Sequence, residues 1–167
     1  MKHFTSKKSF TLIELLLSMT LLALLIVLFI GNYNTALKRG RDTQRKNDLS
    51  QLQKALEMYY EDNGTYPSFT DIFNTKLCTT AGCGATDTVY MIKTPRDPVL
   101  AYTYRYVPNA SGSLYYLYSF IENDLDSGSG VSVKGFDTEV YCDSAKTTVL
   151  CRYYVGSSNA PQVAPNP

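Results

Sequence analysis

The chain has 167 residues, of which 44% are hydrophobic and 19% are charged, so it can form one compact domain and one long apolar segment. Its formal charge of +1 gives no general reason to expect binding to nucleic acid or to anionic membranes. The only histidine is His3, near the start of the chain. Without another imidazole for base catalysis, a hydrolytic triad or a metal site, we expect the protein not to be an enzyme.

The first element expected along the chain is a membrane helix over residues 10–31. From Phe10 to Ile30 the only ionisable residue is Glu14, and a helix of that length spans the roughly 30 Å of a bilayer's hydrocarbon core. The alternative is a cleaved secretory signal peptide. Its apolar region is usually about 7–15 residues long and ends at a small-residue site, which the sequence after Ile30 does not resemble.

Glu14 is the unusual residue of this segment. A carboxylate inside an apolar helix costs about 2.5–3.5 kcal/mol on insertion scales, and such residues are usually paired or functional. The alternative is that Glu14 lies near one face of the bilayer and reaches the headgroups unaided.

Lys7-Lys8-Ser9-Phe10-Thr11-Leu12-Ile13-Glu14-Leu15-Leu16 resembles the processing signal of type IV prepilins and type II secretion pseudopilins. The resemblance implies that a leader, residues 1–9, is removed between Ser9 and Phe10 and that the new N-terminus of Phe10 is methylated. It also implies an assembly role for Phe10 and Glu14, because the new ammonium group of one subunit can pair with the carboxylate of its neighbour. The family prefers glycine before the cut, where this chain has Ser9, and often has proline where this chain has Gly31.

The helix is expected to continue as an amphipathic half over residues 32–64. Leu49, Leu52, Leu56 and Tyr59 recur at intervals of three and four, which predicts one face packed on a domain. Asn63-Gly64 predicts the end of the helix. The stretch up to Tyr66-Pro67 is similar to the corresponding segment of major pseudopilins and minimal pilins.

The orientation in the membrane is ambiguous from charge, because basic residues lie on both sides of the apolar segment. Those after it are Lys38, Arg39, Arg41, Arg45 and Lys46. The cysteines favour export of the C-terminal part, since four of them at C-x4-C and C-x8-C spacing fit disulfides better than redox or zinc motifs.

Three disulfide pairings are open to four cysteines. Short loops close readily, which favours Cys78–Cys83 and Cys142–Cys151. The alternative is four reduced and buried thiols.

A globular β-rich domain is expected over residues 65–156. Residues 102–107 and 114–120 alternate around a turn and predict a hairpin, and residues 138–142 and 149–155 predict two further strands. The predicted fold is therefore α+β, with the long N-terminal helix packed on a roughly four-stranded antiparallel sheet. Residues 95–98 resemble the turn that precedes the sheet in pseudopilins. Residues 157–167 are expected to form a flexible tail.

No cofactor is expected, with calcium as a weak alternative. Oxygen-rich loops can bind calcium, and the resemblance to pseudopilins makes Asp124, Asp126 and Asp137 candidate ligands, with Glu122 beside them. The family's usual Asp-Gly pattern is missing, so a solvated acidic loop is the favoured interpretation.

The function predicted is that of a structural subunit of a type IV pilus-like filament, polymerising through its N-terminal helix after leader cleavage. The alternatives are a pseudopilin of a type II-like secretion system and a non-polymerising, membrane-anchored extracytoplasmic binding protein. The expected partners are copies of the chain, minor pilins, a prepilin peptidase, a membrane assembly platform and the lipid bilayer. We expect a single-pass membrane protein that becomes part of a cell-surface or periplasmic filament.

Overall fold

The structure is a computed structural model that describes residues 10–132, 136, 140–145 and 148–161, without the side chains of residues 28–32. The leader 1–9 with Ser9, the calcium candidate Asp137 and residues 138–139 lie outside this description. The chain divides into two compact units, Met1–Leu37 and Lys38–Pro167, which are described separately.

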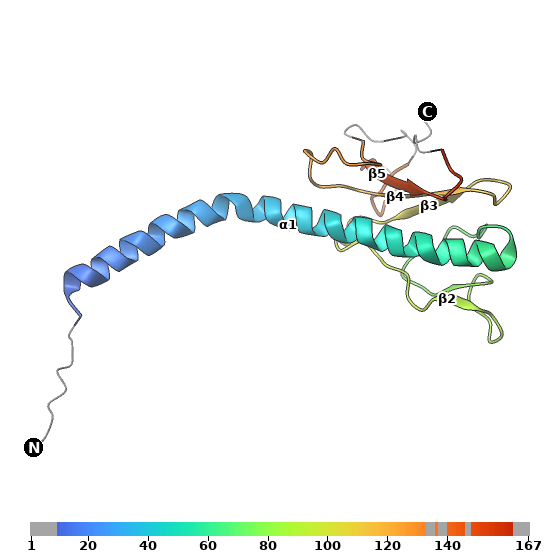
Figure 1. The fold of residues 1–167 in the computed structure, drawn as a ribbon, viewed down its shortest axis with the longest axis horizontal. Coiled ribbons are helices and arrows are strands. Elements are labelled where there is room, and N and C mark those ends of the chain that lie inside the picture. Colours follow the sequence, from blue (N-terminus) through green and yellow to red (C-terminus); the bar gives the residue numbers. More distant parts are fainter. Residues whose placement is uncertain (1–9, 133–135, 137–139, 146–147, 162–167) are drawn as a thin grey trace, which may run out of the picture. The chain divides into compact units, whose positions relative to one another are not determined.

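A single helix, α1, covers Leu12–Asn63 and so contributes residues to both units (Figure 1). Within the residues that the structure describes, no helix combines enough length with enough apolar character to cross a bilayer. The membrane span expected over 10–31 includes residues 28–31, whose side chains lie outside that description.

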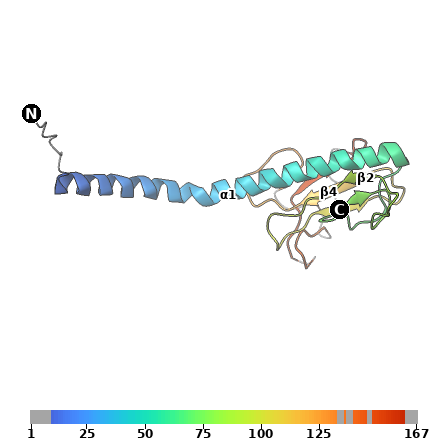
Figure 2. The ribbon, with the colours of Figure 1, turned by 90° about the horizontal axis from the view of Figure 1, so that it is seen from below.

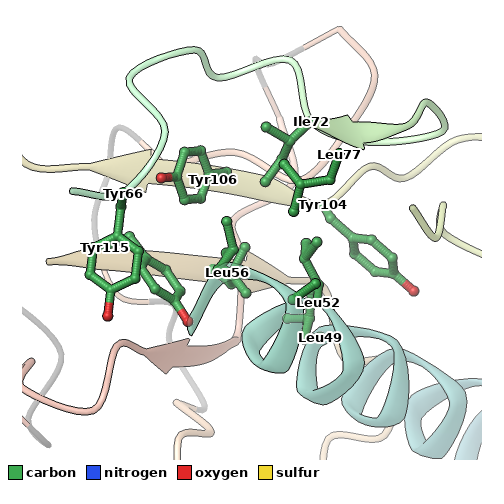
Figure 3. Packing of buried hydrophobic residues seen from close by; sticks show 11 residues of the cluster. Leu49, Leu52, Leu56, Tyr66, Ile72, Leu77, Tyr104, Tyr106 and Tyr115 are labelled. Carbon is green, nitrogen blue, oxygen red and sulfur yellow. The ribbon is translucent and has the colours of Figure 1, made fainter. Parts of the chain in front are cut away.

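In the unit Lys38–Pro167, α1 buries the predicted apolar stripe. Leu49, Leu52 and Leu56 are completely buried, and Tyr59 is nearly so. They pack against side chains from the loop after the helix and from the strands (Figure 3), namely Tyr66, Ile72, Leu77, Tyr104, Tyr106, Tyr115 and Leu117. Burying one leucine side chain contributes about 1.5–3 kcal/mol, so this face fixes α1 to the domain.

The helix ends at Asn63, as the sequence predicts. Gly64 takes the left-handed conformation, with φ of 71°, and its N–H donates to the carbonyl of Tyr60 at 2.7 Å. The side-chain amide of Asn63 donates from Nδ2 to the carbonyl of Tyr59 at 2.8 Å. These bonds satisfy carbonyls that the end of a helix otherwise leaves without partners.

Two antiparallel ladders flank α1 in this unit (Figures 1 and 2). The larger has the strand order β3-β4-β5, with β3 at Arg105–Pro108, β4 at Tyr115–Ser119 and β5 at Tyr153–Gly156. The smaller pairs β1, Leu77–Cys78, with β2, Val89–Met91. The predicted α+β fold is confirmed, and β3 and β4 are the predicted hairpin.

Where one sheet of roughly four strands is expected, the described residues form a three-stranded sheet and a separate pair of strands. Tyr141 makes only an isolated bridge with Leu150, next to the hydrogen bond from the Cys142 N–H to the carbonyl of Val149. Beyond this short pairing, β5 forms its ladder with β4.

The tail expected from residue 157 is ordered at its start. Ser157 is buried and its N–H donates to the carbonyl of Tyr115 at 3.1 Å, and Ala160 is also buried. Residues 162–167 lie outside the described part of the chain.

Candidate functional site

The first candidate site is the apolar surface of the unit Met1–Leu37. Its large apolar side chains from Phe10 to Val27 are all exposed in the single chain, with 72% of Phe10 and 77% of Leu12 accessible. A soluble monomer rarely exposes a contiguous apolar patch of this extent, and such patches mark contacts with membranes or other proteins. This surface therefore needs a covering partner outside the chain.

Glu14 is the acidic residue in the first turn of α1. Its backbone N–H donates to the hydroxyl of Thr11 at 3.3 Å, which provides an N-terminal cap. A carboxylate in the first turn interacts favourably with the positive end of the helix dipole. Within the part of the chain that the structure describes, the carboxylate of Glu14 makes no hydrogen bond or ion pair, which leaves it available to a group from another molecule.

The second candidate site is an ionic cluster at the start of the unit Lys38–Pro167, centred on Arg45. The side chain of Arg45 is fully buried, and it donates to both carboxylate oxygens of Asp97 at 2.8 and 2.9 Å. It also donates to Asp42 and to Glu122, each at 2.8 Å. Burial acts to lower the pKa of Arg45, but its three carboxylate partners raise it above the ordinary value, so the cluster keeps this residue charged.

The same cluster fastens the loop that begins at Ile121 to the helix. The carboxylate of Asp42 accepts hydrogen bonds from the backbone N–H groups of Glu122 and Asn123, at 2.9 and 2.8 Å. Arg41 donates to Glu122 from Nε at 2.8 Å. The guanidinium of Arg41, helped by that of Arg45, lowers the pKa of Glu122 to about 2.

The described part of the acidic loop is largely exposed, and the side chain of Asp124 is 82% accessible, although two of its carboxylates pair with basic side chains. The interpretation as a solvated acidic loop stays a prediction. Asp126 pairs with Lys46 at 2.6 Å and Asp124 pairs with Arg152 at 2.6 Å. The pairing with Lys46 lowers the pKa of Asp126. Among the described residues, no group of three or more metal-binding side chains comes together. Lys46 and Arg152 are therefore the partners of Asp126 and Asp124, the two described carboxylates for which calcium is the alternative partner.

The four cysteines form two local disulfides, Cys78–Cys83 and Cys142–Cys151, which are the pairs favoured by loop length. The first joins the end of β1 to the following turn, and the second crosses the short pairing around Tyr141 and Leu150. Three of the four residues are fully buried, namely Cys78, Cys142 and Cys151. Cys83 is half-buried, so the second bridge lies in the interior of the domain and the first reaches towards its surface.

The family profile described as Type II secretion system (T2SS), protein G matches residues 32–134. The chain belongs to this family of type IV pilin-like proteins. A second profile, the Prokaryotic N-terminal methylation motif, matches residues 5–30, which include Phe10 and Glu14.

The chain is also 43% identical over 61 residues to the Type IV wide pilus major component of Thermus thermophilus. The aligned part covers 36% of this chain and 47% of that relative, so the match spans about half of the relative's length. No solved structure matches the chain.

The sequence predicts the two disulfides but not the ionic cluster, and the roles of Phe10 and Glu14 stay predictions. Three of the basic residues that follow the apolar segment bind carboxylates of the domain. The sequence does carry a signal for this cluster. Charged residues gather around Arg45, which lies on the helix face that continues into the apolar stripe beginning at Leu49.

Proposed function

We propose that this chain is the precursor of a structural subunit of a type IV pilus-like filament, assembled through the N-terminal part of α1. The observation that carries the proposal is the wholly exposed apolar surface from Phe10 to Val27 with Glu14 as its acidic residue. A filament made of copies of this chain covers that surface by packing the helices together. The methylation motif and the likeness to a pilus component support this function.

The proposed processing step is cleavage between Ser9 and Phe10 by a prepilin peptidase, followed by methylation of Phe10. Cleavage creates an ammonium group at Phe10, close along the chain to Glu14. In an apolar surrounding, a carboxylate is best satisfied by such a cation. Pairing of Glu14 in one subunit with Phe10 of its neighbour then sets the register of the filament.

The proposed division of the chain follows from these steps. Residues 1–9 are the leader, 10–31 the segment held in the bilayer before assembly, and 32–64 the amphipathic half of the helix. The globular domain, with its two disulfides, is proposed to lie on the exported side, because disulfides persist in oxidising compartments. Minor pilins and a membrane assembly platform are the further partners proposed.

A pseudopilin of a type II-like secretion system is the second candidate. The match of residues 32–134 to the secretion protein G family favours it. Both candidates are filament subunits that are not enzymes, and they differ in the machine that assembles them. Deleting the gene and measuring secretion of exoproteins alongside surface pili separates the two, because a pseudopilus subunit is required for the first and a pilus subunit for the second.

The test of assembly is Glu14→Ala in the full precursor, produced with its peptidase. Because Glu14 lies outside the unit that holds the core and the disulfides, the variant should keep both bridges and lose most of its sedimentable filaments. Ser18→Ala is the matched control, since the hydroxyl of Ser18 bonds only to the carbonyl of Leu15 one turn earlier. Normal filament yield from Glu14→Ala contradicts the pairing.

A further inference from the structure

The charges of α1 in the unit Lys38–Pro167 are arranged in an unusual way. Between residues 40 and 60, six charged residues are buried or half-buried against the domain, namely Arg41, Asp42, Arg45, Lys46, Asp48 and Glu57. Over the same stretch, Lys54 is the only exposed residue that is charged. The exposed residues of this stretch are therefore mostly uncharged and polar, such as Gln44, Asn47 and Gln51.

Exposed charges of opposite sign lie at the two ends of this part of α1. Lys38 and Arg39 are exposed at one end, and Glu61 and Asp62 are exposed at the other. In the described part of the chain none of these four side chains takes part in an ion pair. The nearby cations Arg41, Arg45 and Lys46 are already paired with Glu122, Asp97 and Asp126.

The acidic end is unfavourable in the single chain. Glu61 and Asp62 lie in the last turn of α1, where the helix dipole is negative, and no basic residue lies in that turn. A carboxylate at this end of a helix is destabilising by several tenths of a kcal/mol unless a cation approaches it. The arrangement therefore favours a partner that brings positive charge.

We propose that this partner is a second copy of the chain, whose Lys38 and Arg39 contact Glu61 and Asp62 of the first. The inference rests on the proposed filament. One chain cannot make the contact itself, because the two ends are 61 − 38 = 23 residues apart, which is about 35 Å of helix. Two parallel helices shifted by that distance bring the opposite charges together.

The contact is heterologous, because each copy uses one end of this part of α1 to bind one neighbour and the other end to bind the next. Contacts of this kind repeat without closing when the rotation between copies does not close a ring, and they build a fibre. The two charged pairs thus set the axial shift between subunits.

The experiment reverses each charged pair in the full precursor and then reverses both together. Lys38→Glu with Arg39→Glu should reduce sedimentable filaments by about tenfold or more, and so should Glu61→Lys with Asp62→Lys, because like charges then face each other. The fourfold variant that carries both reversals should recover most of the wild-type yield. Lys76→Glu with Lys93→Glu is the matched control for the Lys38 and Arg39 reversal, because it changes the net charge by the same amount at exposed residues elsewhere in the domain.

The outcomes separate this inference from the proposed function. Absence of filaments from wild-type protein contradicts the proposed function itself. Normal yield from either double reversal, with wild-type filaments present, overturns the inference and leaves the function standing. Loss in both double variants without recovery in the fourfold variant also overturns it, because these residues then matter without pairing. Intact disulfides in every variant, checked by peptide mapping, establish that the domain has folded.

Discussion

Replacement of Arg45 by methionine should be the most damaging single change in the ionic cluster. Methionine keeps much of the aliphatic stem but removes the guanidinium that binds Asp97, Asp42 and Glu122. Glu122 retains Arg41, whereas Asp97 and Asp42, whose side chains are 0% and 4% exposed, lose their cation. Breaking a buried ion pair by removing one partner costs about 3–5 kcal/mol, a large part of the 5–15 kcal/mol that stabilises a typical domain.

The assay is urea unfolding of the full chain in detergent, since urea leaves the ionic strength unchanged. The protein has no tryptophan and 14 tyrosines, so near-ultraviolet circular dichroism of tyrosine reports the packing of the domain. Arg41→Met is the matched control. Arg41 is 33% exposed and Glu122 keeps Arg45 when it is removed, so this variant should lose only about 0–1 kcal/mol.

Combining Arg45→Met with Asp97→Asn tests the cause of the loss. The asparagine is neutral and keeps an oxygen for the N–H of Val99, which donates to Asp97 at 2.8 Å. If an unpaired buried carboxylate is responsible, the double variant should be more stable than the sum of the two single losses predicts, by about 1–3 kcal/mol. Additive losses, or a loss below about 1 kcal/mol for Arg45→Met, would refute the reasoning.

Three further predictions concern the same unit. The pKa of Glu122 is about 2 in the folded state against an ordinary 4.5, so its contribution to stability is complete above pH 4.5 and is lost as the pH falls towards 2. In an acid titration, Glu122→Gln should therefore lose less stability over that window than wild type. Gly40→Ala should raise the free energy of unfolding in urea by up to about 1 kcal/mol, since its Cβ would meet nothing within 4 Å. Gly130→Ala should lower that free energy by about 1–3 kcal/mol, because φ is +75° and the Cβ would strike the carbonyl of Tyr154. A calcium chelator should leave the thermal midpoint unchanged, because Lys46 and Arg152 already pair with Asp126 and Asp124; a drop of several degrees would contradict this account of the loop.

Features encoded by neighbouring residues could be predicted from the sequence. The stripe of Leu49, Leu52 and Leu56 and the stop at Asn63-Gly64 depend on helix periodicity and on the conformational freedom of glycine, so both were predictable. The hairpin of β3 and β4 was predictable for the same reason, because alternating strands flank a turn in which Gly112 has φ of 65°.

Features that depend on distant residues could not be predicted from the sequence. Asp97 is 52 residues from Arg45, and Asp126 is 80 residues from Lys46. No local pattern specifies which distant carboxylate folds back onto which cation. The pairing of β5 with β4 is likewise decided by tertiary packing. The ladder of β1 and β2 was missed although its second strand, Val89-Tyr90-Met91, is rich in strand-forming residues.

The most direct test of the central claim is the N-terminus of the chain in assembled fibres. Filaments should be sheared from cells that produce the precursor and its peptidase, sedimented and analysed by mass spectrometry. The proposed function predicts that this chain is present in the fibres and begins at Phe10, with the mass of one added methyl group. Fibres whose subunit begins at Met1, or processed protein that never sediments, would contradict it.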